Sequence, residues 1–155
     1  MNEFSTAGIV VKYAVEATSG TRPTTNYTAI PSIKTTPDIN PEPTTIQVTD
    51  LSDKEWHRYI PALKDVGGAL GFLANLTSGF KSAWATLCTA SETALTSSKA
   101  TWFEITFPNF DSFYFTARPT PLGVSANEVD NVVEITAYVT PDSIHGWDTA
   151  STTTP

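Results

Sequence analysis

The sequence predicts a mainly β (α+β) protein, an antiparallel β-sandwich or partial barrel with one flanking α-helix and a long extended arm. Three observations predict this class. Only 16% of the residues are charged, against about 25% in typical domains, and the abundant threonine and serine favour strands and loops over helices. Eleven prolines and eight glycines divide the chain into short segments. Most of these segments alternate apolar and polar residues, and one has a helical period instead.

The length and charge of the chain limit its organisation. At 155 residues we expect one domain over residues 1–148 and a polar C-terminal tail over 149–155. The net charge of −7 and the scattered cations exclude a grip on nucleic acid but permit a wall past which DNA slides. Cys88 is the single cysteine, so we expect no internal disulfide and a buried structural thiol.

No part of the sequence predicts export or membrane insertion. The first residues lack a basic region followed by an apolar run, so we expect no signal peptide. No apolar stretch approaches about 20 residues, the length that a membrane-spanning helix needs. We therefore expect the chain to fold in a reducing cytoplasm.

Two strands are expected first. Residues 9–16 alternate, with Ile9, Val11, Tyr13 and Val15 on the buried face. Residues 27–34 form a second, weaker strand that Pro31 interrupts, and a proline at this place confines a strand to an edge or a bulge.

Residues 35–68 are too long for an ordinary loop, and because they carry aromatic and branched residues we do not expect a disordered segment. They contain several prolines, a short strand at 44–49 and a charged turn at 50–55. We interpret them as an extended arm that buries its apolar residues against another surface. The alternative is a long hairpin packed on its own domain. The arm residues expected at the contact are Pro41, Pro43, Ile46, Val48, Leu51, Trp56, Tyr59, Ile60 and Leu63.

A strand and the helix follow the arm. In the strand we expect Leu70, Phe72, Ala74 and Leu76 to face inward. The period then changes, and an amphipathic helix over about 79–97 fits, with Thr77 or Ser78 as its N-cap. We interpret its apolar stripe as core, comprising Phe80, Trp84, Leu87, Cys88, Ser91 and Leu95.

The last third of the chain predicts strands only. In 101–107 and 113–116 the inward residues are expected to be Phe103, Ile105, Phe107, Phe113 and Phe115. The outward ones are expected to be Trp102, Glu104, Thr106, Tyr114 and Thr116. After a break at 119–123, residues 128–140 form the longest predicted strand, with Val133, Ile135, Ala137 and Val139 on one face and Val132, Glu134, Thr136 and Tyr138 on the other. From Pro141 onward the chain is polar, and we expect its end to be loosely held.

The sequence contains no pattern typical of catalysis or of metal or cofactor binding. His57 and His145 fall in predicted loops, and HExxH, CxxC, phosphate-loop and nucleophile-elbow motifs are missing. The paired carboxylates, Asp50 with Asp53 and Glu128 with Asp130, are interpreted as solvated surface. The acidic residues of the arm lack the EF-hand pattern. We therefore expect no enzyme activity, no catalytic residues, no metal and no cofactor.

The succession of segments resembles a known family. The segments that carry the resemblance are 12–16 (KYAVE), 29–33 (AIPSI), 37–43 (PDINPEP), 49–53 (TDLSD), 58–65 (RYIPALKD), 68–72 (GALGF), 101–105 (TWFEI), 113–115 (FYF) and 133–139 (VEITAYV). In this order they resemble the major tail tube proteins of siphophages, bacteriophages with long non-contractile tails, that infect Gram-positive bacteria. Val66 is a departure, since a proline is expected there. We expect no C-terminal immunoglobulin-like module of the kind that some relatives carry.

The resemblance implies a structural role. Such subunits have the tail tube type of sandwich and self-assemble into six-membered rings that stack into the tube through which DNA is ejected. The implied partners are other copies of the chain, the tape measure protein, and the tail completion and tip proteins, with double-stranded DNA only as passing cargo. The implied location is the tail of the virion, after assembly in the bacterial host cytoplasm.

The resemblance also assigns roles to residues. The arm, 35–68, reaches a neighbouring subunit or ring, and we expect it to be disordered in a lone subunit and to become ordered on assembly. Outward acidic residues, Glu104 and Glu134, are candidates for a lumen lining that repels DNA phosphates.

Two alternatives stay open. Within the same class, the chain fits the tube subunit of a phage tail-like bacteriocin or a related injection particle. From another class, it fits a stand-alone carbohydrate- or cell-wall-binding β-sandwich module, in which Trp56, Trp102 and Trp147 stack on sugars.

Overall fold

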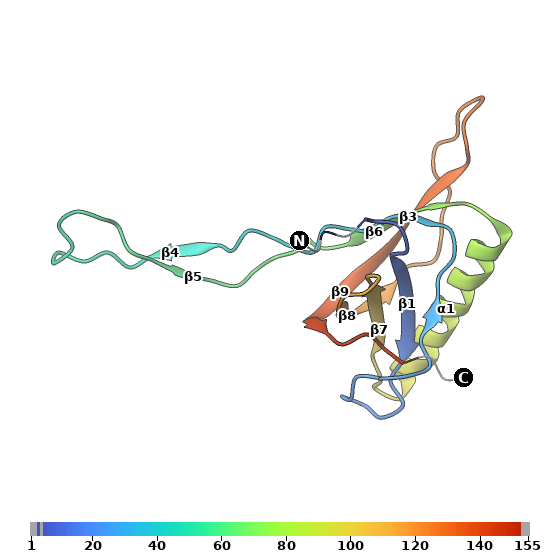
Figure 1. Cartoon of the computed structure of the whole chain (residues 1–155), viewed down its shortest axis with the longest axis horizontal. Coiled ribbons are helices and arrows are strands. Elements are labelled where there is room, and N and C mark those ends of the chain that lie inside the picture. The colour runs from blue at the N-terminus through green and yellow to red at the C-terminus, as the bar shows by residue number, and fades with distance from the viewer. Residues whose placement is uncertain (1–2, 4, 153–155) are drawn as a thin grey trace.

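The computed structural model describes residue 3 and residues 5–152, and it is mainly β: a curled antiparallel sheet with one helix (Figure 1). The sheet has seven strands in the order β2-β1-β7-β8-β9-β6-β3, and β4 pairs with β5 in a separate ribbon. The elements are β1 (Val10–Val15), β2 (Thr28–Ala29), β3 (Ile33–Thr35), β4 (Thr45–Gln47), β5 (Tyr59–Pro61), β6 (Leu70–Asn75), α1 (Ser78–Thr96), β7 (Thr101–Thr106), β8 (Ser112–Pro119) and β9 (Glu134–Asp148).

One short segment forms both edges of the sheet. The predicted strand over 27–34 is divided into β2 and β3, which lie at opposite ends of the strand order. Pro31 removes a backbone donor between them, and Ser32 has a φ of +65°. The edge position expected from Pro31 is therefore confirmed, and the segment draws the two ends of the curled sheet toward each other.

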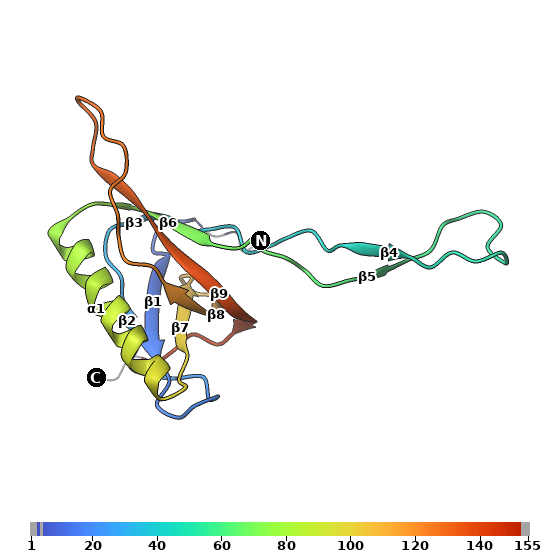
Figure 2. The same ribbon diagram turned by 180° about the vertical axis from the view of Figure 1, so that it is seen from behind.

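The core lies between one face of the sheet and α1 (Figure 2). Phe72, Phe103 and Phe115 are fully buried, as their alternation predicts. From the helix, Phe80, Trp84 and Leu87 fill the same cluster. The helical period therefore placed this part of the core correctly.

The two ends of α1 are fixed by specific contacts. The hydroxyl of Thr77 accepts a hydrogen bond from the amide of Phe80 at 3.1 Å, so Thr77 is the N-cap, as predicted. The indole Nε1 of Trp84 donates to the carbonyl of Thr120 at 2.8 Å and ties the helix to the connection after β8.

In α1 and just before it, three apolar residues lie differently from their prediction. Leu95 is exposed and Ala94 is buried in its place, because the last turn of α1 rotates Leu95 away from the sheet. Cys88 is only half-buried at the edge of the core cluster, and burial followed by the nearby Glu92 carboxylate raises the pKa of its thiol. Leu76 comes after the end of β6 and is exposed.

The face of the sheet predicted to point outward is covered at its centre. Glu104 and Tyr114 are fully buried, and Thr116 is nearly so. The phenol of Tyr114 donates to the carbonyl of Thr149 at 2.7 Å, and the amide of Thr152 bonds the carbonyl of Thr24 at 3.2 Å. The prediction of an open outer face was wrong because segments remote in sequence, near residues 22–27 and 149–152, pack over it.

β9 differs from its predicted bounds. It runs over Glu134–Asp148 instead of 128–140, so the residues after Pro141 belong to the sheet. Register shifts opposite it lie between Tyr114 and Phe115 and between Thr116 and Ala117, and the second falls beside Pro141, where an irregularity is expected. Residues 149–152 of the predicted loose tail are fastened to the sheet, and 153–155 lie outside the described residues.

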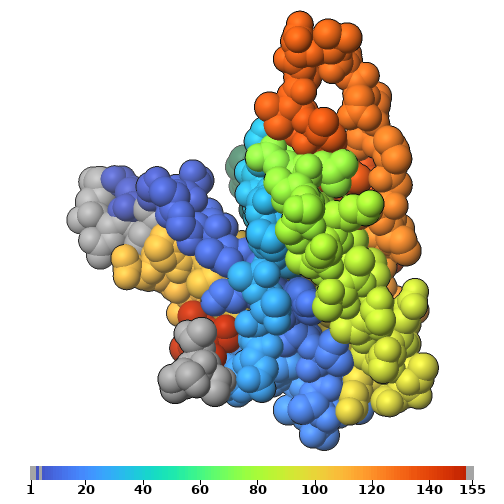
Figure 3. Space-filling model, turned by 90° about the vertical axis from the view of Figure 1, so that its right-hand side faces the viewer, coloured from blue at the N-terminus to red at the C-terminus, as the bar shows by residue number. Residues whose placement is uncertain are grey.

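Two segments project from this body. The β4–β5 ribbon extends far from the sheet (Figure 1). The connection 120–133 between β8 and β9 rises beside α1 (Figures 1 and 3). The rest of the described chain forms the sheet, α1 and the loops that connect or cover them.

Candidate functional site

The β4–β5 ribbon is the most exposed regular structure of the chain. Its strands pair antiparallel, with Thr45 opposite Pro61, Ile46 opposite Ile60 and Gln47 opposite Tyr59. Figure 1 shows the ribbon pointing away from the curled sheet and from α1. The ribbon therefore extends away from the surface of its own domain.

The apolar side chains of the ribbon have little cover from their own chain. Leu51 is 103% exposed, Leu63 91% and Trp56 82%, and Ile46, Val48, Tyr59, Ile60 and Pro43 are also exposed. Of the residues predicted for the contact, only Pro41, nearer the root, is half-buried. The alternative hairpin interpretation required these side chains to pack on their own domain, and in the structure they are exposed instead. Contiguous exposed apolar side chains of this kind mark an interaction surface.

The root of the ribbon is anchored in the domain. Ile39 on one side and Val66 on the other pack against the hydrophobic core. Beyond Val66 the chain turns into β6 through Gly67 and Gly68, whose φ angles are +85° and +93°, a region that glycine adopts without strain. The carboxylate of Asp65 accepts a hydrogen bond from the Gly67 amide at 2.8 Å and fixes this turn.

The tip of the ribbon is closed by an ion pair cluster. Arg58 donates from Nε to Asp53 at 2.8 Å and from Nη2 to Asp50 at 3.0 Å. The hydrogen bonds from the side chain and amide of Ser52 lower the pKa of Asp50. Asp50 is exposed, as the interpretation of this pair as solvated surface predicts, whereas Asp53 is half-buried by its contacts in the tip.

Further hydrogen bonds cross the ribbon between its strands and its tip. The amide of Arg58 donates to the Thr49 hydroxyl at 2.9 Å, and Gln47 Nε2 lies 2.8 Å from His57 Nδ1. The ribbon thus has hydrogen bonds of its own within one chain.

A second exposed apolar segment was missed by the sequence interpretation. Val124, Val129 and Val132 lie in the connection 120–133 and are strongly exposed. Because 128–140 was predicted as a strand with a buried face, Val132 and its neighbours were placed in the sheet. The signal that was available is the Asn-Asp-rich stretch 127–131, which is typical of a turn.

The two candidates for the lumen lining are not brought together. Glu104 is fully buried, so its assignment to an open acidic surface is corrected. Its carboxylate accepts hydrogen bonds from the amide and hydroxyl of Ser151, at 3.1 and 2.6 Å, and from the Thr106 hydroxyl at 3.0 Å. Burial acts to raise the pKa of Glu104, but these hydrogen bonds outweigh it and lower the pKa. Glu134 stays partly exposed at the start of β9 and pairs with Lys34.

Around Glu104 the outer face carries a polar and aromatic layer. The Arg22 guanidinium lies 4.2 Å above the Tyr114 ring and pairs with Asp148 at 2.8 Å. Burial, followed by the Glu104 charge, raises the pKa of Tyr114 to about 12. This layer holds residues 149–152 in place.

The three tryptophans of the sugar-binding alternative lie in separate environments. Trp56 is at the ribbon tip, and Trp102 is half-buried, with its Nε1 donating to Glu16 at 3.1 Å. Trp147 is 55% exposed and packs against Phe107 and Phe113, with ring centroids 5.3 and 5.4 Å away. They form no common platform.

The remaining expectations concern metals and membranes. Within residues 5–152, no group of three or more histidine, cysteine, aspartate or glutamate side chains is arranged to hold a metal ion. In the part of the chain that the structure describes, no helix combines the length and the hydrophobicity needed to cross a membrane.

Comparison of the chain with family models and with curated proteins gave no match. The site is therefore defined by its own geometry: a rooted, hydrogen-bonded ribbon that presents apolar side chains away from its domain.

Proposed function

We propose that this protein is the structural subunit of a phage tail tube, which self-assembles into stacked hexameric rings that form a conduit for DNA. The single observation that carries the proposal is the β4–β5 ribbon, which exposes its apolar side chains away from its own core. The role is architectural rather than catalytic, and the resemblance of the segment order to siphophage tail tube proteins supports it.

The energetics of the ribbon favour repeated contacts. Fully burying one large apolar side chain contributes about 1.5–3 kcal/mol, so Leu51, Trp56 and Leu63 together contribute roughly 5–9 kcal/mol before costs. Association costs an estimated ~4–15 kcal/mol in lost freedom. One ribbon contact is therefore close to neutral, whereas a closed ring that repeats it several times is stable. This is the behaviour expected of a subunit that is a monomer when dilute and a tube when concentrated.

Exposed backbone groups support the same role. The strands at the two sheet edges have two and three residues, and each strand of the ribbon has three. Edge strands this short limit pairing of a lone molecule with other chains. In the proposed tube the edges pair only between subunits that the ribbon contact already holds together.

The partners and the location follow from the proposal. In addition to its own copies, the subunit contacts the tape measure protein and the tail completion and tip proteins, within a virion tail assembled in the bacterial cytoplasm. The net charge of −7 suits DNA as passing cargo, because an acidic wall does not bind phosphate. Of the two lumen candidates, only Glu134 is kept.

The first experiment tests whether tubes form through the ribbon. Purified wild-type protein is concentrated and followed by sedimentation and negative-stain microscopy, beside Leu51→Glu and Leu63→Glu. We expect tubes for the wild type and a large loss for both variants, since a buried unpaired carboxylate is costly. Leu76→Glu is the matched control, because Leu76 is exposed but lies outside the ribbon. A wild type that stays a compact monomer at every concentration would overturn the proposal.

A second candidate, a carbohydrate-binding module, is favoured by the exposed Trp147. Its ring borders a cavity of about 360 Å³ whose lining also includes Ile39, Phe107 and Phe113. This function requires a stable monomer that pulls down with cell-wall polysaccharide and loses binding in Trp147→Ala. The tail-like bacteriocin shares the tube geometry and is distinguished by the neighbouring genes.

A further inference from the structure

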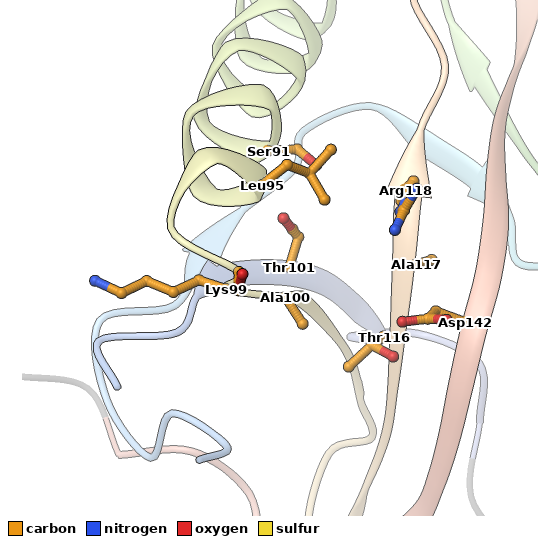
Figure 4. A pocket seen from close by; sticks show the side chains of 10 residues that line it. Ser91, Leu95, Lys99, Ala100, Thr101, Thr116, Ala117, Arg118 and Asp142 are labelled. Atoms are coloured by element: carbon orange, nitrogen blue, oxygen red, sulfur yellow. The ribbon is translucent and has the colours of Figure 1, made fainter. Parts of the chain in front are cut away.

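Outside the ribbon, polar groups converge on a cavity of about 300 Å³ at the C-terminal end of α1. Figure 4 shows Ser91 and Leu95 of the helix near Thr101 of β7, with Arg118 and Asp142 on the neighbouring strands β8 and β9. Lys99 borders the same cavity but points away from it. The cavity lining therefore includes one guanidinium, one carboxylate and the hydroxyls of Ser91, Ser98, Thr101 and Thr116.

These groups have unused hydrogen-bonding capacity. Ser91 and Thr101 are only 5% and 4% exposed, yet among the described residues neither hydroxyl has a hydrogen-bond partner. Within the same residues, Arg118 and Asp142 form no ion pair, either with each other or elsewhere. Nearly buried polar groups in native structures are usually bonded, so the two hydroxyls, which lie beside two exposed charged groups without an ion pair, mark this cavity as a place where a partner could bind.

The ribbon tip carries the complementary charges. Lys54 and Glu55 are adjacent, exposed and, within the described chain, without an ion pair, whereas Asp50, Asp53 and Arg58 beside them are bonded to one another. A cation and an anion side by side match the carboxylate and guanidinium of the cavity. The chain therefore contains both halves of a complementary pair.

One molecule cannot join these halves by itself. Figures 1 and 2 show the ribbon extending to the side of the sheet opposite the helix, away from the C-terminal end of α1. The ribbon is rooted in the core through Ile39 and Val66 and stiffened by its own bonds. The tip that enters the cavity must therefore come from a second copy.

We propose that the cavity at the end of α1 receives the ribbon tip of a neighbouring copy, with Glu55 bound by Arg118 and Lys54 by Asp142. The hydroxyls of Ser91 and Thr101 donate to the incoming carboxylate or to backbone carbonyls of the tip. This inference rests on the proposed function, because it names the receptor of the ribbon within the tube. Charge pairs of this type set register and orientation between partners as well as strengthening them.

The test is a charge exchange in the full-length chain. Arg118→Glu and Glu55→Arg each place like charges together, and we expect each to raise the concentration at which tubes form by about tenfold or more. The double variant restores an opposite pair, and we expect its threshold to return to within about threefold of the wild type. Assembly is measured by pelleting and negative-stain microscopy.

The matched controls are charge reversals at positions outside the proposed contact. Lys81→Glu and Glu92→Lys lie on the exposed side of α1 and are expected to assemble at the wild-type threshold. Because Arg118 and Glu55 are exposed and have no ion pair in the described chain, the variants are expected to melt like the wild type. A second exchange, Lys54→Glu with Asp142→Lys, repeats the test independently of Arg118.

The outcomes separate this inference from the proposed function. If wild-type tubes form, and the single variants assemble like the controls or neither double variant recovers, the receptor is elsewhere and the tube proposal stands. If the wild type forms no tubes, both fail. Loss in the single variants with recovery in the double variants supports the contact.

Discussion

The curled sheet and the β4–β5 ribbon are both antiparallel β-structures, but they place their apolar side chains in opposite environments. In the sheet, Phe72, Phe103 and Phe115 have no exposed surface, whereas Leu51 and Trp56 in the ribbon are almost fully exposed. A seven-stranded sheet covered by a helix stabilises itself by burial, while an isolated two-stranded ribbon is marginal on its own. The difference teaches that one region supplies folding stability and the other is available for binding.

The largest expected effect on the free energy of unfolding comes from comparing two tryptophan substitutions, one in the core and one in the ribbon. Trp84→Ala removes a side chain that is 1% exposed and bonded to Thr120, so we expect a loss of about 3–5 kcal/mol in the free energy of unfolding. Trp56→Ala is expected to change it by less than about 0.5 kcal/mol. Urea denaturation of dilute monomer measures both. Similar losses for the two variants would show that the ribbon takes part in the fold of its own chain.

A smaller effect is expected at Glu104, which belongs to the covered outer face. Glu104→Gln keeps the shape but removes the charge that accepts the hydrogen bonds of Ser151, and we expect a loss of about 1.5–3 kcal/mol at pH 7. Because folding lowers the pKa of Glu104, its contribution is fully present above the ordinary carboxyl pKa and is lost as the pH falls through the lower folded value. The difference between wild type and variant should therefore shrink under acid conditions.

Measurement of the unfolding free energy at pH 7, 5 and 3 checks this dependence. Amide hydrogen exchange at Ser151 gives a second readout, since the variant should lose protection there before the core does. A difference that stays constant over this range, or grows on acidification, would contradict the assignment of Glu104 as an ionised anchor.

The smallest effect on overall stability is expected at Arg58, within the ribbon. Arg58→Ala breaks the contacts with Asp50 and Asp53, so the amides of the tip should exchange faster. The denaturation midpoint of the sheet should not change, because exposed ion pairs contribute little to a fold. Slower tube formation with an unchanged denaturation midpoint would support the separation of the ribbon from the sheet. A lower midpoint would show that the two regions are not independent.

Elements set by short-range patterns were predicted from the sequence. Alternation gave β1, β6, β7 and β8 with the correct core face, and the period of Phe80, Trp84 and Leu87 gave α1 with its Thr77 cap. The same alternation placed Glu104 on the face of β7 opposite the core. That placement is correct for the strand, but Glu104 is not exposed in the folded protein, because other segments cover that face. A pattern along one strand reports which face a side chain is on, and it carries no information about what later packs over that face.

The candidate site was predicted in part. Composition and length singled out residues 35–68, and the apolar residues expected there are exposed in the structure except for Pro41. The cavity that contains Arg118 and Asp142 was not predicted, because its lining comes from α1, β7, β8 and β9. No spacing rule connects residues that far apart.

The sequence by itself determined the mainly β class, the single capped helix and the identity of the unusual middle segment, because propensity, period and capping act over a few neighbouring residues. The tertiary structure alone decided that β2 and β3 close the two edges, that β9 continues to Asp148 and that Glu104 is buried beneath Ser151. It also decided that the ribbon stands free of its domain. These features depend on contacts between segments distant along the chain, whose geometry exists only once the sheet has curled.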